Sequence, residues 1–490
     1  MSLGLATLEA LLGRLAGLRV VTIGDVMVDR FVYGDVHRVS PEAPIPILAR
    51  THQTVMLGGC GNVARNVAAL GGRAVLIGVI GRDAPGEEAR ALVAREPDIE
   101  DGLVLDSRRP TSLKMRFVSA GQQLLRVDDE VAAPVAGDVE TALVAAVARA
   151  AVGAGAILLS DYGKGVVTAG VISACLAAAR ATGAVLVVDS KARGFAHYGP
   201  VDVVKPNAAE LARATDLPTD TDAQIEMALA RALASCEAGA ILVTRAARGM
   251  SLAVRGEPVR HCVRPPPEVF DTSGAGDTAL AALGIALAAG APIDQAVGLA
   301  LIASGVVVEK AGTATAGPEE VIEAEAALER TPLDAKIASA SRMARVARRW
   351  REKGLRVGFT NGCFDILHPG HIAYLTQARA WCDRLIVGLN TDDSIRRLKG
   401  DGRPVNGLEA RARVLAGLAA VDLVTPFAED TPLALIEAAR PDLLVKGADY
   451  ALDAVVGHDL VTGWGGEVRL ASFLEGHSTT ATLRRLAGQD

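Results

Sequence analysis

Short runs of β-branched and other apolar residues alternate with alanine-rich segments of helical length along most of this chain. The predicted buried strands are residues 19–28, 73–80, 156–160, 185–189, 201–204 and 241–244. Segments of helical length, such as 141–152 and 168–182, lie between several of them. Strands that are apolar on both faces must be covered on both faces, which βαβ units in a parallel sheet provide. The sequence therefore predicts an α/β fold with helices on both sides of a mostly parallel sheet.

Two stretches, 31–57 and 111–128, do not fit this alternation. Within the second stretch, polar and apolar residues alternate over 114–117. A period of two is typical of an antiparallel sheet with one exposed face. We therefore predict a small β lid beside the main sheet.

The chain changes character after Gly317, and its 490 residues are enough for two to four domains. An acidic block precedes Thr331-Pro332, and a basic block over 342–353 follows them. We predict a first domain over 1–318, a linker over 319–340 and a second α/β domain over 341–490. The strands predicted for the second domain are 356–360, 384–389, 423–425 and 443–446.

The basic block has apolar residues at helical spacing, which predicts an amphipathic helix. These residues are Met343, Val346, Ala347 and Trp350. The arginines between them would either bind nucleic acid or form a solvated helix face. The formal net charge of −6 and an aromatic content of 3% favour the solvated face, because nucleic-acid binding uses basic surfaces and aromatic stacking.

Composition also argues against a membrane or disulfide-bonded protein. The longest apolar run, 279–293, is short for a membrane span and predicts a buried helix. The first 17 residues lack the basic and apolar regions of a signal peptide. The six cysteines are scattered without a C-x-x-C pair, so we expect reduced thiols and a cytoplasmic protein.

The string Asp-Thr-Ser-Gly-Ala-Gly-Asp over 271–277 leads directly into that apolar run. Small residues let the backbone approach a ligand, and amides at a helix N-terminus form an anion hole. Such a site suits the γ-phosphoryl group of ATP, and Asp277 would accept the proton of an attacking hydroxyl. The alternative is a flexible loop with an ordinary acidic helix cap, although the seven-residue string is more specific than an isolated G-x-G-D.

Three further motifs, over 58–62, 205–210 and 244–249, occur in an order that resembles the ribokinase (PfkB-type) carbohydrate kinase family over nearly all of 1–318. The resemblance implies a ribokinase-like three-layer sandwich with a small β lid, and it assigns a catalytic base, an anion hole, a Mg-ATP motif, a nucleotide loop and a sugar site. By this resemblance the catalytic base is Asp277, and the anion hole consists of Gly274, Ala275 and Gly276. Asn207 and Glu210 belong to the Mg-ATP motif and hold Mg²⁺ indirectly, and Thr244 and Gly249 lie in the nucleotide loop. The sugar site consists of Asp25, Asp29, Gly58, Gly59 and Asn62. Asp25 has the alternative of a turn acid, since turns also use such carboxylates.

A second string, over 360–371, follows a predicted strand and places His368 and His371 at the start of a helix. Imidazoles near the positive end of a helix suit attack on the α-phosphate of a nucleoside triphosphate, because the departing pyrophosphate needs hydrogen-bond donors. A metal-binding pair and two unrelated core histidines are the alternatives. The H-x-x-H spacing differs from the H-E-x-x-H of zinc proteases.

This string resembles the nucleotidyltransferase superfamily of cytidylyltransferases and adenylyltransferases, over roughly 341–490. The resemblance implies a Rossmann-like domain in which His368 and His371 are catalytic. It also implies that a further set of residues binds the nucleotide: Thr360, Asn361, Gly362, Phe364, Asp365, Lys399, Arg411, Lys446, Asp449, Ser478, Thr479 and Thr480.

The two domains together resemble the bifunctional heptose kinase/adenylyltransferase family of Gram-negative bacteria. The resemblance implies that ATP phosphorylates O1 of D-glycero-β-D-manno-heptose 7-phosphate, that a separate phosphatase removes the 7-phosphate, and that adenylyl transfer from ATP then yields ADP-heptose and pyrophosphate. We expect ATP and Mg²⁺ as cofactors, a homodimer, and no nucleic-acid or membrane partner. The cations expected to bind the sugar's phosphate are Arg38, Lys114, Arg116 and Arg126. The alternative for each of them is an exposed position on a solvated face of the lid.

Two rival functions remain at this stage. One is a kinase/nucleotidyltransferase for another sugar or polyol phosphate. The other is a sugar-nucleotide sensor without activity, against which the intact Asp277, His368 and His371 argue.

Overall fold

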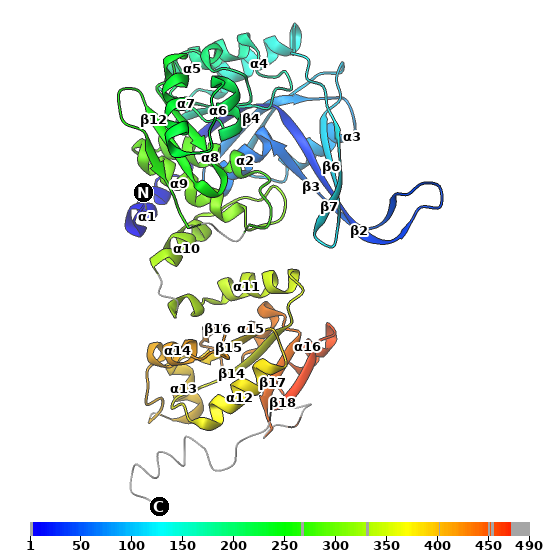
Figure 1. Ribbon diagram of the computed structural model, residues 1–490, viewed down its shortest axis with the longest axis vertical. Helices are drawn as coiled ribbons and strands as arrows, with labels where there is room; N and C mark the ends of the chain where they lie inside the picture. Colours follow the sequence, from blue (N-terminus) through cyan, green and yellow to red (C-terminus); the bar gives the residue numbers. More distant parts are fainter. Residues whose placement is uncertain are drawn as a thin grey trace, which may run out of the picture. The chain divides into compact units, whose positions relative to one another are not determined.

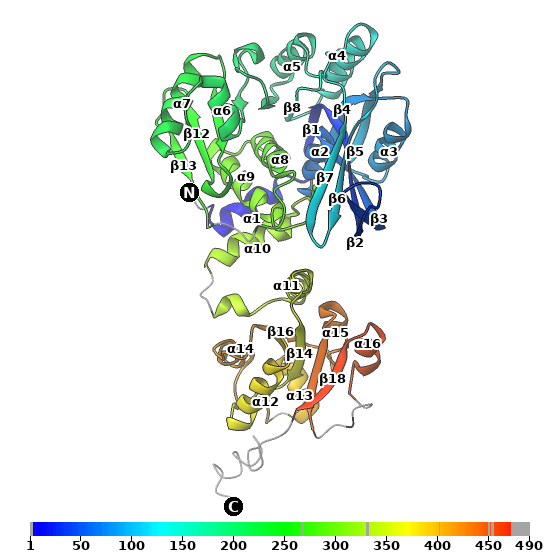
Figure 2. The same cartoon turned by 45° about the vertical axis from the view of Figure 1, so that its right-hand side comes forward.

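The computed structural model describes residues 3–265, 269–329, 333–400, 402–448, 451 and 455–471. The chain forms two compact units, Met1–Ala326 and Ala327–Asp490. Figures 1 and 2 show both units, and each is described here by itself. None of the described helices is long and apolar enough to cross a membrane.

A nine-stranded sheet forms the centre of the first unit, in the order β13-β12-β11-β10-β9-β8-β1-β4-β5. Neighbouring strands of this sheet are parallel except at one edge, where β12 is antiparallel to both β11 and β13. The strands are β1 (Arg19–Gly24), β4 (Arg73–Ile80), β5 (Ile99–Leu105), β8 (Ala156–Asp161), β9 (Val185–Ser190), β10 (Val203–Val204), β11 (Ala240–Thr244), β12 (Met250–Val254) and β13 (Arg260–Cys262).

Helices cover both faces of this sheet. Successive residues of β1 point to opposite sides, so Val20 belongs to one hydrophobic cluster and Val21 to another. The first cluster packs under α1 (Leu5–Gly13), α2 (Cys60–Ala69), α3 (Ala84–Val93), α8 (Ala275–Ala288) and α9 (Ile293–Val307). The second packs under α4 (Asp138–Ala150), α5 (Ala169–Thr182), α6 (Ala208–Thr215) and α7 (Asp222–Ala234). This arrangement confirms the predicted three-layer α/β fold. Two short 3-10 turns, η1 (Ala196–Tyr198) and η2 (Ala246–Arg248), complete the unit.

The apolar run predicted as one buried helix over 279–293 is buried continuously only as far as Ala286, and it is not one helix. It fills most of α8, whose residues are enclosed from Asp277 to Ala286. The chain then turns at Gly290, where φ is +71°, and α9 begins at Ile293.

A separate four-stranded sheet forms the lid, in the order β3-β2-β6-β7. Its strands are β2 (Val26–Val39), β3 (Pro46–Gly59), β6 (Ser112–Ser119) and β7 (Gln122–Asp129), and β2 and β3 extend as a long arm in Figure 1. The predicted strand over 19–28 is therefore two strands. The chain leaves the main sheet at Asp25, between β1 and β2.

The connector between the units is shorter than the predicted linker over 319–340. Helix α10 (Pro318–Glu329) packs on the first unit: Val321 is fully buried, Glu320 pairs with Lys310 at 2.7 Å and Glu325 pairs with Arg264. Two acidic residues of the predicted linker, Glu320 and Glu325, thus form ion pairs that hold α10 on the first unit.

Residues after the connector belong to the second unit. The turn η3 (Asp334–Lys336) is held there because Lys336 Nζ donates to the carbonyl oxygens of Leu418 and Val421 at 3.3 and 2.8 Å. Ile337 then forms a β-bridge with Val424.

The second unit is built on a five-stranded parallel sheet in the order β16-β15-β14-β17-β18. Its strands are β14 (Val357–Gly362), β15 (Arg384–Asn390), β16 (Leu423–Phe427), β17 (Leu443–Gly447) and β18 (Glu467–Ala471). Its helices are α11 (Ala340–Glu352), α12 (Pro369–Ala380), α13 (Asp392–Lys399), α14 (Leu408–Ala416), α15 (Leu433–Ala439) and α16 (His458–Gly463). The fold is Rossmann-like, as predicted. Helix α11 is the predicted amphipathic helix, with Met343 and Ala347 fully buried.

Candidate active sites

Asp277 lies in the first turn of α8, at the carboxyl edge of the main sheet, and is 2% exposed. Its carboxylate accepts a hydrogen bond from Tyr162 Oη at 2.6 Å and one from Asn62 Nδ2 at 3.0 Å. Burial raises the pKa of Asp277 to about 6, and these two hydrogen bonds oppose the rise. A carboxylate with this pKa is well matched to accepting a proton near neutral pH.

Among the small residues before Asp277, Gly274 is the one that the geometry at the start of α8 requires. Gly274 is the N-cap with φ +80°, a conformation that favours glycine, and a Cβ there would lie 2.6 Å from Asn62 Nδ2. A Cβ on Gly276 would lie 3.8 Å from Lys205 Nζ. The backbone of 274–276 therefore offers amides at a helix N-terminus beside a buried ammonium group, an arrangement that suits a phosphoryl group.

Asp25 lies where the chain leaves β1 and is 1% exposed. Its two oxygens accept hydrogen bonds from the backbone amides of Tyr162, Lys164 and Val166 at 2.9, 2.9 and 3.1 Å. Burial raises the pKa of Asp25, although these amides oppose it. In this geometry Asp25 fixes the loop after β8, which is the turn-acid role left open by the sequence.

The other predicted sugar residues gather at the base of the lid. Asp29 is 3% exposed on β2 and pairs with Arg116 Nη1 at 2.5 Å. Gly58 and Gly59 end β3 beside Asp29 and the backbone of Asp25. Asn62, in the first turn of α2, joins this group to Asp277.

The predicted phosphate-binding cations of the lid already face carboxylates. Lys114 Nζ pairs with Asp128 at 3.0 Å and with Glu130 at 2.9 Å, and Arg126 pairs with Asp128 at 2.9 Å. Arg38 is exposed on the arm formed by β2 and β3. A sugar phosphate bound by Lys114 or Arg126 would therefore compete with acidic groups of the lid.

Asn207 and Glu210 form the capping box of α6. Asn207 Oδ1 accepts from the Glu210 amide at 2.8 Å, and Glu210 Oε2 accepts from the Asn207 amide at 2.7 Å. Glu210 Oε1 also accepts from Lys191 Nζ at 3.0 Å. Because these oxygens are engaged, they fit a Mg²⁺ ion through its water shell better than by direct coordination, which agrees with the preference of Mg²⁺ for keeping water ligands.

The predicted nucleotide loop over 244–249 lies beside this capping box, since Asn207 and Thr244 form a β-bridge. Gly249 closes the loop with φ +80°, and a Cβ there would lie 2.1 Å from the carbonyl oxygen of Cys262. No side chain other than hydrogen fits at this position without moving the backbone.

The sequence analysis gave no role to four polar residues of this site, although Lys205 begins the motif over 205–210. Tyr162 contacts Asp277, Lys191 lies 4.8 Å from the centre of the Tyr162 ring, and Lys205 pairs with Asp189 at 2.9 Å in a fully enclosed position. Each of the four stands within three residues of the end of a predicted strand. Carboxyl ends of parallel strands form the ligand-binding edge of an α/β sheet, so their position was the available signal.

In the second unit, β14 ends in the predicted string. Thr360 is buried, with its hydroxyl 2.6 Å from Tyr374 Oη, and Phe364 has φ +42° at the turn. Asp365 accepts hydrogen bonds from Arg403 Nη1 at 2.6 Å and from the Asn406 amide at 3.1 Å. Burial opposes ionisation, but these contacts hold the pKa of Asp365 below its usual range.

His368 is the N-cap of α12, and its ring stacks on that of His371 with 3.8 Å between the ring centres. Burial, and then the neighbouring His368, lower the pKa of His371 to about 4. Without bound ligand, the His371 ring is therefore neutral at pH 7 and would act as an N–H donor rather than as a positive charge. Among the residues that the structure describes, no group of three or more His, Cys, Asp or Glu side chains is arranged to hold a metal ion.

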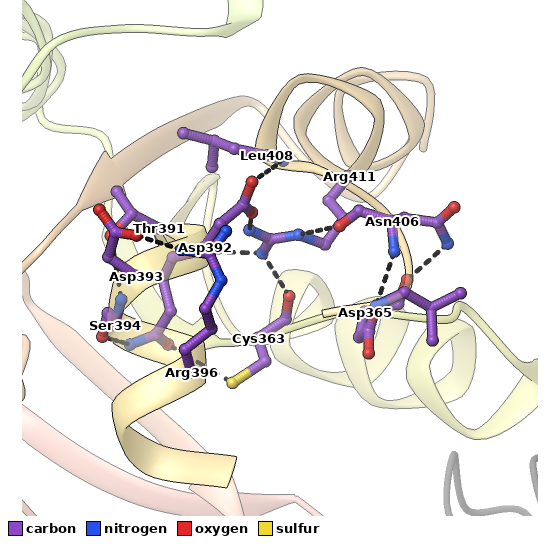
Figure 3. A network of polar contacts seen from close by, with 12 residues as sticks. Cys363, Asp365, Thr391, Asp392, Asp393, Ser394, Arg396, Asn406, Leu408 and Arg411 are labelled. Carbon is purple, nitrogen blue, oxygen red and sulfur yellow. Dashed lines mark hydrogen bonds and ion pairs between the residues drawn. The ribbon is translucent and has the colours of Figure 1, made fainter. Parts of the chain in front are cut away.

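Arg411 does not reach an open surface from α14; its side chain is fully enclosed (Figure 3). The guanidinium donates to the carbonyl oxygens of Asn406, Cys363 and Asn390 at 2.9, 2.8 and 2.9 Å, and to Asp392 Oδ1 at 2.6 Å. The prediction that Arg411 contacts the nucleotide is not supported by this geometry. Its side chain instead ties together three loops at the carboxyl edge of the sheet.

The remaining predicted nucleotide residues are only partly described. Asn361 and Gly362 end β14, Lys399 ends α13 and Lys446 lies in β17. The predicted residues Asp449, Ser478, Thr479 and Thr480 lie outside the described residues.

Comparison with known proteins gives the same division of the chain. Residues 18–320 match the model described as pfkB family carbohydrate kinase, and residues 359–479 match the model described as Cytidylyltransferase-like. The protein named Bifunctional protein HldE from Caulobacter vibrioides is 50% identical over 472 residues, which cover 96% of this chain and 97% of that protein. A protein of the same name from Hyphomonas neptunium is 49% identical over 487 residues, covering 98% of each chain.

Among solved structures, phosphofructokinase-2 from Escherichia coli in complex with substrates and products is similar to the first unit. Its TM-score is 0.53 at 22% identity, and the match covers 64% of this chain and all of that structure. At this identity the similarity shows the fold alone.

Proposed function

The chain belongs to the family of bifunctional HldE proteins, and from that membership we propose how its two sites divide the work. The protein is a carbohydrate kinase and a nucleotidyltransferase. As an enzyme of ADP-heptose synthesis, it phosphorylates D-glycero-β-D-manno-heptose 7-phosphate at O1 and transfers the adenylyl group of ATP to the heptose 1-phosphate. Both reactions use ATP, and the rival sensor function is not favoured.

In the kinase, Asp277 accepts the proton of the sugar O1 hydroxyl as that oxygen attacks the γ-phosphorus of ATP, and ADP leaves. The amides of 274–276 stabilise the charge on the transferring phosphoryl group. The single observation that carries this assignment is a buried carboxylate held at 2.6 and 3.0 Å by Tyr162 and Asn62 at the N-terminus of α8.

We assign Mg²⁺, with its water shell, to the Asn207–Glu210 capping box, whose oxygens suit a hydrated ion. When bound, the ion neutralises charge on the phosphates of ATP. The lid residues Lys114, Arg116 and Arg126 bind the 7-phosphate of the sugar. They lie on the same small sheet as Asp29, which belongs to the proposed sugar site.

In the adenylyltransferase, a phosphate oxygen of the heptose 1-phosphate attacks the α-phosphorus of ATP and pyrophosphate leaves. His368 and His371 donate hydrogen bonds to the charge that develops there. Their place at the start of α12 and their stacked rings support this role.

The experiment incubates the protein with ATP, Mg²⁺ and a panel of sugar 7-phosphates and 1-phosphates, following ADP and pyrophosphate separately. ADP release only with the heptose 7-phosphate, and pyrophosphate release only with the heptose 1-phosphate, would support the proposal. Equal turnover of other sugar phosphates would favour the alternative substrate. The proposal also includes a cytoplasmic homodimer, whose mass sedimentation would measure. It further includes a separate phosphatase that acts between the two reactions, which a coupled assay with that phosphatase would test.

A further inference from the structure

Tyr162 connects the proposed catalytic carboxylate with both halves of the kinase site. It follows β8 directly, its amide donates to Asp25 Oδ2 at 2.9 Å, and its hydroxyl donates to Asp277 Oδ1 at 2.6 Å. Lys191 lies over its ring and pairs with Glu210 of the capping box. The phenol ring therefore lies between the sugar side and the ATP side.

The hydrogen bond runs from the phenol to the carboxylate. Burial and the neighbouring Asp277 raise the pKa of Tyr162 well above its ordinary value, so its proton stays on the oxygen. Asn62 holds the other carboxylate oxygen. Each carboxylate oxygen has two lone pairs, so one on each remains for the substrate hydroxyl.

We propose that Tyr162 is the positioning residue that orients Asp277 and keeps its carboxylate ionised for proton transfer. This inference rests on the proposed role of Asp277 as the base. Tyr162 itself transfers no proton, because its hydroxyl donates to Asp277 in the ionised state that the reaction needs.

The direction of the effect follows from the charges around Asp277. Asp189 disfavours its ionised form and Lys205 favours it. Lys191 and Cys60 interact electrostatically with Asp277, Asp29 does so with Tyr162, and Asp25 accepts from the Tyr162 backbone amide. Substitution of Tyr162 leaves all of these groups in place and removes one charge-assisted hydrogen bond. The base then titrates at higher pH, and activity is lost first on the acidic side.

The test is the pH profile of kcat/KM for heptose 7-phosphate in Tyr162→Phe. We expect the acidic limb to move to higher pH by about one unit, which is roughly a 10-fold loss below the limb and much less above it. Tyr162 replaced by 3-fluorotyrosine keeps the shape and strengthens the donor, so it should move the limb to lower pH even if the Phe variant fails to fold.

The matched control is Tyr198→Phe. Tyr198 is also buried and also donates to a carboxylate, Asp161 Oδ2 at 2.5 Å, but it has no contact with Asp277 among the described contacts. The limb should stay at its wild-type position in this variant. The adenylyltransferase rate of the same samples, which comes from the other unit, normalises the kinase rate to the amount of enzyme.

An acidic limb that does not move in either Tyr162 variant, or an equal loss at every pH, would overturn the positioning role. Asp277→Asn separates this result from failure of the proposed function. If that variant keeps its kinase activity, the base assignment is wrong; if it is inactive while the Tyr162 limb stays fixed, only the Tyr162 inference fails.

Discussion

Replacing Arg411 by Ala tests whether this arginine supports the adenylyltransferase site or binds the nucleotide. The substitution removes four hydrogen bonds, leaving three backbone carbonyl oxygens and Asp392 without their guanidinium. Asp392 is 31% exposed and keeps part of its hydration, so the cost comes mainly from the three carbonyl oxygens. At the lower end of the penalty for a buried unsatisfied acceptor, their loss amounts to roughly 3–5 kcal/mol. For a unit of this size, we expect the midpoint of thermal unfolding to fall by roughly 6–20 °C. Arg411→Lys should lose less, because it keeps the charge without the planar fork.

Tryptophan fluorescence isolates this effect, because all three tryptophans, Trp350, Trp381 and Trp464, belong to the second unit. Urea unfolding followed by their emission should shift to lower denaturant in the Arg411 variants. The control is Arg413→Ala on the same helix, since Arg413 is 58% exposed and surface ion pairs contribute about 0–1 kcal/mol. Wild-type unfolding of Arg411→Ala, with only the KM for ATP raised, would refute the support role and restore the nucleotide contact.

Four further predictions concern the sites and their boundary. Asp277→Asn should lower sugar phosphorylation by roughly 10²–10⁴-fold, the usual contribution of a general base, while adenylyl transfer measured as pyrophosphate release stays unchanged; near-normal ADP release would disprove the assignment. His371→Asn should lower adenylyl transfer by roughly 10²–10³-fold without changing the kinase rate. The pKa of His371 is lowered to about 4 from an ordinary 6.5, so the unfolded chain binds more protons than the folded chain between these two pH values. The second unit should therefore lose stability as the pH falls from 6.5 to about 4. In urea unfolding, the stability of His371→Asn should depend less on pH than that of the wild type. Fragments 1–330 and 331–490 should fold separately and keep kinase and adenylyltransferase activity respectively, whereas a cut at 318 should destabilise the kinase because it removes α10; equal stability of fragments 1–318 and 1–330 in thermal unfolding would contradict this.

The local sequence pattern was enough to predict the α/β architecture, because the formation of each strand and helix depends on residues close together in the sequence. Apolar runs over 73–80 and 156–160 became β4 and β8 within one residue, since strands apolar on both faces have few alternatives to the middle of a covered sheet. The helix-entry strings at 271–277 and 360–371 were identified for the same reason: small residues and caps at a helix start act on their immediate neighbours.

Two features depended on partners that lie outside the local segment. The strand over 19–28 is broken because the buried Asp25 binds amides 137 to 141 residues away, which redirects the chain into the lid. The acidic block after Gly317 docks as α10 because its partners, Lys310 and Arg264, come from earlier segments.

The functional side chains divide in the same way. Sequence by itself placed the proposed catalytic residues, Asp277 and the His368–His371 pair, at helix starts, because that placement depends on local motif spacing. Only the tertiary structure decided what surrounds them: Tyr162 reaches Asp277 across 115 residues, and Arg411 is enclosed by loops 21 and 48 residues away. The physical reason is that burial and hydrogen bonding depend on which segments meet in space. They set whether an arginine faces a ligand or the protein interior, and whether a carboxylate titrates near pH 4 or about 6.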